Sequence, residues 1–170
     1  MADETSARAT PQDVTEARVA ATLRAALRAR IAQVVAAPAS EGDARWIVRL
    51  LRELCARLNA LTPSRADLHA ELDAALDAPL VEQMLRHGAA DAADLAPFAA
   101  RVIARLRALV APAQDDDVDA LDAAVRAEPD AALALARLLC DADDVLRETE
   151  RLNRWCADRM EAALAARGQR

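Results

Sequence analysis

The stretch Trp46–Leu61 reads WIVRLLRELCARLNAL and places apolar side chains three and four residues apart. That spacing is typical of a helix with one broad buried face. The preceding segment 40–43, SEGD, resembles a capping box, in which a serine side chain pairs with the first free amides of a helix. We therefore expect this helix to form the centre of an all-helical core.

The residues before this stretch predict an earlier helix. Thr10 and Pro11 are typical of a helix start, and Pro38 ends the helix. Its apolar stripe, which we expect to be buried, consists of Val19, Leu23, Leu27, Ile31 and Val34. The stripe is narrow, and a marginal helix gains most from packing against another chain. Self-association is therefore expected to involve this first helix.

The residues after this stretch predict shorter helices. Ser64 and Asp67 are expected to cap a third helix, and Gly88 is expected to end a fourth in the left-handed conformation. The apolar residues of these two helices are Leu68, Leu72, Leu76, Leu80, Val81, Met84 and Leu85. Trp46 and Cys55 are expected to belong to the core of the second helix.

A fifth helix is expected to begin near Asp91 or Asp94, to hold Pro97 in its first turn and to end at 111–112. Three segments follow: a helix ending near Glu128, a separate helix with Leu133 and Leu135, and a last amphipathic segment. The apolar residues expected to pack in these four segments are Phe98, Val102, Ile103, Leu106, Leu109, Val110, Val118, Leu121, Val125, Leu133, Leu135, Leu138, Leu139, Val145, Leu146, Leu152, Trp155, Met160 and Leu164.

Short connections between helices favour antiparallel neighbours. We therefore expect an all-α fold, a compact antiparallel bundle of about six to eight helices. A single domain is expected over residues 10–167, between disordered tails at residues 1–9 and 168–170.

The composition excludes several classes of protein. With 54% hydrophobic and 29% charged residues among 170, the chain is too apolar to be disordered. A net charge of -6 and 2% aromatic residues argue against nucleic-acid binding. No secretory signal and no apolar run of about 20 residues is present, so no membrane span is expected. The three cysteines are odd in number and widely spaced, which indicates a reducing, cytoplasmic compartment.

No catalytic constellation can be recognised. His69 and His87 lie on different expected helices, without a second ligand at metal-binding spacing, and no glycine-rich phosphate loop occurs. Cys55 is expected to be a core residue, whereas Cys140 and Cys156 are expected nearer the surface. We therefore expect no enzyme, no cofactor and no metal. A small helical hydrolase with acids around magnesium remains an alternative, as does a structural, self-assembling protein.

Two groups of residues are candidates for binding a protein partner. Pro112 followed by Asp115, Asp116 and Asp117 is typical of a plain helix start, but it could also form an acidic docking corner for a basic partner. The row Arg45, Arg49 and Arg52 could form the rim of an interface. Arginine rows of this kind, including Arg101 with Arg105, more commonly cover apolar edges while their charged ends stay in water.

The middle of the chain resembles the T-complex protein 11 family. The resemblance covers Trp46 to Val118 and runs through WIVRLLRELCARLNAL, then LHAELDAALDAPLVEQMLRHGAAD from Leu68, then DLAPFAARVIARLRALVAPAQDDDV from Asp94. The family's motif Leu-Cys-Ala-Pro-x-Arg-Asp corresponds here to 109–115, LVAPAQD. Val110 stands in place of the family's cysteine, and Gln114 in place of its arginine.

This resemblance implies an all-helical protein without recognised catalytic residues. It also implies an association with the modulation of cyclic-AMP and protein kinase A signalling. If the family's arginine contacts a partner, Gln114 would remove that contact. The resulting hypothesis is a non-enzymatic, cytoplasmic protein that acts by binding another protein, with homo-oligomerisation as a further possibility.

Overall fold

The computed structural model describes residues 11–168, and side chains from residue 18 to residue 167. Within this part the chain is helical and forms no strand, which confirms the all-α expectation. The expected tails at 1–9 and 168–170 and the cap at Thr10 lie outside the described residues, except for Gly168. The helices are α1 (Pro11–Val35), α2 (Glu41–Ala60), α3 (Ala66–Ala75), α4 (Ala78–His87), α5 (Ala92–Leu109), the 3₁₀ turn η1 (Pro112–Gln114), α6 (Asp115–Arg126) and α7 (Ala131–Gly168).

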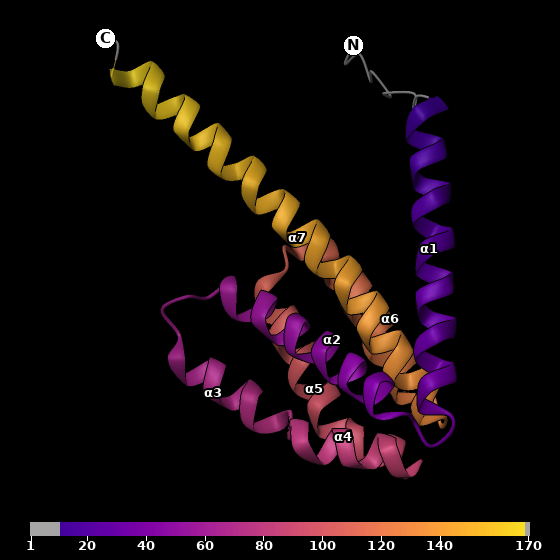
Figure 1. The fold of residues 1–170 in the computed structure, drawn as a ribbon. Helices are drawn as coiled ribbons and strands as arrows, with labels where there is room; N and C mark the ends of the chain where they lie inside the picture. The colour runs from indigo at the N-terminus through magenta and orange to yellow at the C-terminus, as the bar shows by residue number, and fades with distance from the viewer. Residues whose placement is uncertain (1–10, 169–170) are drawn as a thin grey trace.

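The long helix α7 organises the fold. It packs against α1, α2, α5 and α6 (Figure 1). Helices α3 and α4 both pack on α2, and α3 also contacts α5. The apolar face of α2 lies in the core, as its spacing predicts, with Ile47, Leu51 and Leu58 wholly buried. Leu106 of α5 and Leu138 of α7 are buried in the same cluster.

Side chains at the helix ends explain several of the boundaries. Ser40 Oγ accepts a hydrogen bond from Asp43 N at 3.1 Å, which confirms the predicted start of α2. Asp77 and Asp91 cap α4 and α5 in the same way. Helix α3 begins after Arg65, and no side chain caps it, so the expected Ser64 cap is wrong.

Gly88 ends α4 in the left-handed conformation, with φ of 62°, as expected. A Cβ atom at this position would lie 2.9 Å from Pro38 Cδ, in the connection between α1 and α2. In that same connection, Ala39 N donates a hydrogen bond to Leu85 O of α4 at 2.9 Å. The end of α4 therefore holds the connection that leads out of α1.

The expectation of two separate final helices is wrong, because α7 runs unbroken for 38 residues. In the structure, Asp141 and Asp144 pair with Arg28 and Arg24 of α1, and Asp143 pairs with Arg57 of α2. Since these acids are compensated and the segment contains neither glycine nor proline, the helix continues through it.

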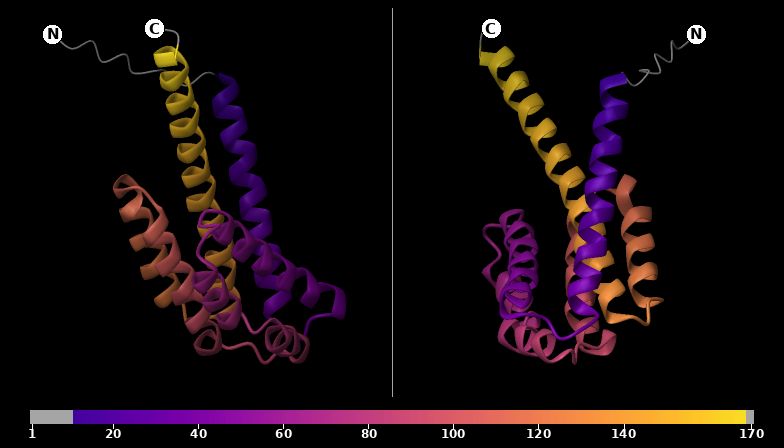
Figure 2. Two further views of the ribbon diagram at one scale, coloured as in Figure 1. Left: turned by 90° about the vertical axis from the view of Figure 1, so that its left-hand side faces the viewer. Right: turned by 45° about the vertical axis from the view of Figure 1, so that its right-hand side comes forward.

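The apolar stripe of α1 is only partly buried, contrary to expectation. Ile31 and Val34 lie in the core, whereas Val19, Leu23 and Leu27 are 54%, 66% and 39% exposed. Figures 1 and 2 show the reason: α1 and α7 separate toward the two chain ends and extend past the shorter helices. No other helix in the described part of the chain covers these outer ends.

Smaller departures have local causes. Pro97 is the sixth residue of α5 and not part of its first turn, because Asp91 caps the helix earlier than Asp94 would. Cys140 is buried, contrary to expectation, because it lies on the inner part of α7. Leu80 and Leu133 are exposed near the starts of α4 and α7, and Trp46 is half-buried at the edge of the core.

Candidate functional site

The acidic corner, Asp115, Asp116 and Asp117, occupies the first turn of α6, immediately after the 3₁₀ turn begun by Pro112. All three carboxylates are exposed, and none forms an ion pair with a described side chain. Their position favours them electrostatically, since the first amides of a helix are unpaired and attract negative charge. The structure thus places the corner as a helix start that also leaves three negative charges free in solvent.

The arginine row lies elsewhere. Arg45 pairs with Glu41 of its own helix and approaches Glu82 of α4, with Nε and Oε1 3.6 Å apart. Arg49 and Arg52 are exposed on the same helix. The acidic corner lies instead next to α7, so the structure does not bring the two predicted groups together.

A recess of about 430 Å³ joins the acidic corner to α7. We call it the acidic recess, and its polar lining consists of Gln114, Asp117, Asp141, Asp144 and Glu148. Burial raises the pKa of the Asp144 carboxyl; Arg24 opposes this shift, while Asp143 and Asp141 add to it. Asp144 already pairs with Arg24, Asp141 with Arg28 and Glu148 with Arg151, which leaves Asp117 as the acid of the recess without an ion pair to a described side chain.

Gln114, which stands in place of the family's arginine, is buried at the floor of this recess. The Thr149 hydroxyl of α7 lies 2.8 Å from Val145 O and 3.5 Å from Gln114 Oε1, and Gln114 Nε2 has no partner among the described residues. The start of α6 thus lies against α7 near Thr149.

The outer segment of α7, residues 151–168, continues the apolar stripe of the inner segment, residues 131–150. On this stripe Met160 and Leu164 are 65% and 61% exposed, and Trp155, on a different face of the helix, is 55% exposed. Trp155 follows Asp141 and Glu148 at intervals of seven residues, so it lies on the same helix face as the acidic recess. The guanidinium carbon of Arg159 lies 4.9 Å from the centre of the Trp155 ring.

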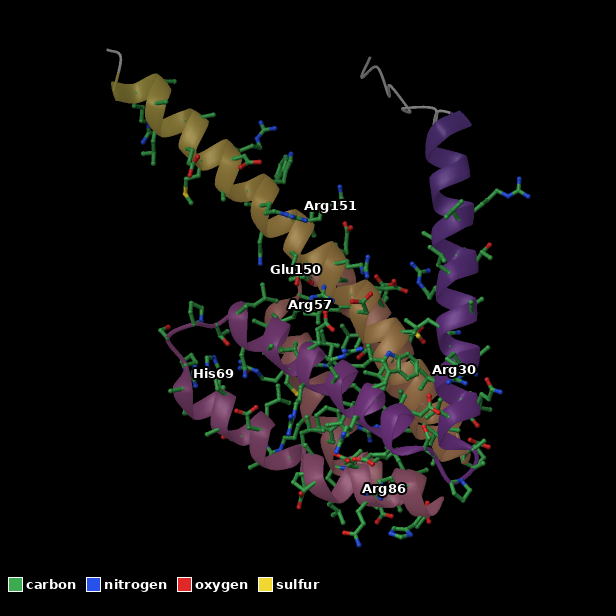
Figure 3. The ribbon with its side chains drawn as sticks, in the orientation of Figure 1. Arg30, Arg57, His69, Arg86, Glu150 and Arg151 are labelled. Atoms are coloured by element: carbon green, nitrogen blue, oxygen red, sulfur yellow. The ribbon has the colours of Figure 1, made fainter. Side chains whose placement is uncertain are left out.

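Arg57 fixes the base of this outer segment, and the sequence pattern did not single it out. Its Nε and Nη2 donate to the two carboxylate oxygens of Glu150 at 3.0 and 3.1 Å, and its Nη1 donates to Asp143 (Figure 3). Burial opposes the charge, but the bonds to Glu150 and Asp143 outweigh it and raise the pKa of Arg57. A signal was present: Asp143 and Glu150 are seven residues apart, which places both acids on one face of α7.

The other predicted sites show no arrangement for catalysis. His69 Nε2 lies 2.9 Å from Thr62 O. Burial, with a contribution from Asp73, raises the pKa of the Cys55 thiol to about 12, and burial also raises the pKa of Cys140, so neither thiol is activated. Within the described residues no three histidine, cysteine or acidic side chains are grouped to hold a metal ion. Nothing in this part of the chain supports the hydrolase alternative.

Another recess, of about 470 Å³, lies between α5, α6 and α7. Its walls are mainly alanine side chains with Leu135 and Leu138. At its edge Asp122 is already paired with Arg126 and Arg107. This recess therefore offers apolar contact and little directed polar recognition.

The chain matches a known protein family. The family model described as T-complex protein 11 matches residues 5–147, a longer region than the quoted motifs span. The match ends inside α7, so the outer segment lies beyond it. No curated protein and no solved structure matches the chain. Among the described residues, no helix is both long and apolar enough to span a membrane.

Proposed function

This chain belongs to the T-complex protein 11 family, and we propose that it is a non-enzymatic domain that binds a basic amphipathic helix of another protein. The contact surface is the outer segment of α7 together with the acidic recess and the acidic corner. The partner helix places its apolar side chains on α7 and its basic side chains against the acids.

One observation carries this proposal: the apolar stripe of α7 continues from the core into solvent with the same spacing of apolar residues. Fully burying a side chain of the size of leucine or methionine contributes about 1.5–3 kcal/mol. Met160 and Leu164 continue this stripe, and no described neighbour covers them, whereas Trp155 lies on a different face of the helix, beside the acids. Such a stripe, read at intervals of three and four residues, is complementary to another amphipathic helix.

Charge determines the kind of helix. The chain carries a net charge of -6, which opposes close approach of a second copy. The acidic corner adds three carboxylates without an ion pair to a described side chain, whereas the acids of the recess on α7 already pair with arginines. A helix rich in arginine or lysine satisfies both features, because its charged residues meet carboxylates while its apolar residues cover Met160 and Leu164.

Site-specific photo-crosslinking tests the proposal. A photoreactive amino acid is placed at Trp155 or, as a control, at the exposed Arg86 of α4, and the protein is expressed in its native cell. We expect a protein captured at Trp155 and not at Arg86, with the crosslink in a basic amphipathic segment. Equal capture at both positions would contradict the proposal. Crosslinks between two copies, with a dimer in light scattering, would favour self-assembly.

Binding affinities then measure the contributions of the acidic corner and of the apolar stripe separately. The captured segment is made as a peptide and titrated while Trp155 fluorescence is followed. Both Asp117→Arg and the pair Met160→Ser with Leu164→Ser should weaken the peptide at least tenfold, since each loses about 1.4 kcal/mol or more. The control Arg86→Ser should leave its affinity unchanged. Unchanged affinity in both surface variants would rule out this binding face.

The signalling role implied by the family is part of the same proposal. We propose that binding takes place in the reducing cytoplasm and modulates cyclic-AMP-dependent phosphorylation. Phosphorylation of a protein kinase A reporter peptide, measured in cells with and without the Met160→Ser, Leu164→Ser variant, tests this role. If reporter phosphorylation with this variant equals that with the unaltered chain, the signalling role is contradicted. The binding surface is tested separately by the crosslinking experiment.

A further inference from the structure

A second polar site lies on the opposite side of α2, where α3 meets α5. The side chain of Arg105 on α5 is only 9% exposed and forms part of the wall of a cavity of about 340 Å³. The remaining lining includes Arg65, Arg101, Leu68 and Ala104. An arginine on the buried face of α5 contradicts the expectation that Arg105 keeps its charged end in water.

The hydrogen bonds of Arg105 leave most of its donors unused. A guanidinium carries five N–H groups. Nη2 donates to Thr62 Oγ1 at 2.6 Å, Nε has no partner, and no described carboxylate lies within ion-pair distance. Arg57, which is more exposed, pairs with two acids. Arg105 is thus a buried positive charge without a negative partner, an arrangement that is costly unless an anion joins it.

The other charges around the cavity are already paired with each other. Arg65 Nη2 lies 2.7 Å from Asp67 Oδ2, and Arg101 Nη1 lies 3.4 Å from Glu71 Oε2. The bond to Arg65 lowers the pKa of the Asp67 carboxyl to about 2, so Asp67 stays ionised. These two exposed pairs are free to rearrange, because exposed ion pairs are weak.

The wall of the cavity is also partly apolar. Leu72 is buried beside it, and Leu68, Ala104 and Ala108 complete this side. His69 also lies on helix α3 (Figure 3), and its Nε2 atom lies 2.9 Å from Thr62 O. A ligand for this cavity therefore needs a negative end for Arg105 and a short apolar part for the leucines and alanines.

We propose that this cavity binds a small organic oxyanion, a carboxylate or a phosphate monoester, through Arg105. Two oxygens of the anion accept bonds from the guanidinium in the two-pronged geometry that arginine favours. Arg101 and Arg65 lie at the mouth and add positive charge when their partners swing away. The proposal is independent of the helix-binding surface on α7.

Nitrogen-15 NMR of the arginine side chains tests this site, because the Nε–H group of Arg105 is a direct reporter. The probes are inorganic phosphate and, separately, hexanoate, each titrated to millimolar concentrations at constant ionic strength. We expect the Arg105 resonance, assigned by its loss in Arg105→Met, to shift and saturate with at least one probe. Saturation with hexanoate alone identifies a carboxylate ligand, and saturation with phosphate alone identifies a phosphate ligand.

Thermal unfolding supplies the second measurement. At a tenfold excess over Kd, the bound probe should raise the Tm of the unaltered chain by about 3–6 °C. Arg105→Met should show no such rise, while the control Arg86→Met should behave as the unaltered chain. If Arg105→Met fails to fold, Arg105→Lys, which retains the charge without the two-pronged geometry, should bind at least tenfold more weakly. An unshifted Arg105 resonance with both probes, or the same rise in Arg105→Met, would overturn the proposal.

Discussion

The inner and outer segments of α7 carry the same apolar stripe but have different surroundings. In the inner segment, Leu135, Leu138 and Leu146 are wholly or almost wholly buried. In the outer segment, Met160 and Leu164 are more than half exposed. Because the pattern is the same in both, burial is decided by where the neighbouring helices end. The comparison shows that an amphipathic pattern marks a face able to pack without fixing which partner packs on it.

The sharpest expected contrast between the segments is in thiol reactivity. Cys156 on the outer segment is exposed, whereas Cys140 on the inner segment is buried and its thiol pKa is raised. A disulfide reagent should modify Cys156 at least about a thousandfold faster, because Cys140 reacts only after an opening that costs several kcal/mol. Mass spectrometry of partly labelled protein measures both rates. Comparable rates would mean that the inner segment opens freely.

Core truncation is expected to give the next largest effect. Leu138→Ala removes a buried side chain from the inner segment and should lower the free energy of unfolding by about 2–5 kcal/mol. Urea denaturation followed by circular dichroism measures the change. A loss below about 1 kcal/mol would show that the core around the inner segment repacks around the missing side chain.

The boundary between the segments depends on Arg57. Arg57→Ala leaves Asp143 and Glu150 without their partner on α2, and we expect a loss of about 1–3 kcal/mol, less than for a fully buried pair because these groups are partly exposed. Arg151→Ala, which removes a pair within the exposed surface of α7, serves as the control. Equal losses in the two variants would argue that Arg57 does not anchor the outer segment.

The smallest effect is expected at the far end of the helix. Leu164→Ala should change the free energy of unfolding by less than about 0.5 kcal/mol, since the side chain is already in water. The same urea experiment at several protein concentrations provides the measurement. A larger, concentration-dependent loss would reveal that a second copy covers the stripe.

The sequence predicted the parts of the fold that depend on local spacing. The core face of α2, the cap at Ser40 and the left-handed Gly88 followed from periodicity and backbone chemistry. The continuity of α7 did not, because Asp141 and Asp143 are compensated by arginines of other helices. Such pairs depend on tertiary contacts that a single sequence does not contain.

The candidate sites divide in the same way. The exposed acidic corner could be predicted from Pro112 and the run of acids that follows it. The acidic recess could not, because it requires α6 to lie against α7. Arg105 carried a readable signal, since it falls between Ile103 and Leu106 on the apolar face of α5, but its lack of an acidic partner appears only once α3 and α5 are packed together.

The contact between Gly88 and Pro38 links the end of α4 to the orientation of α1. Helix α1 is roughly 37 Å long, from its 25 residues and a rise of about 1.5 Å each. A side chain at position 88 would push on the connection at one end of this rod, and a tilt of about 10° there would move the other end by roughly 6 Å. The direction in which α1 projects into solvent therefore depends on Gly88, at the end of α4, having no Cβ atom.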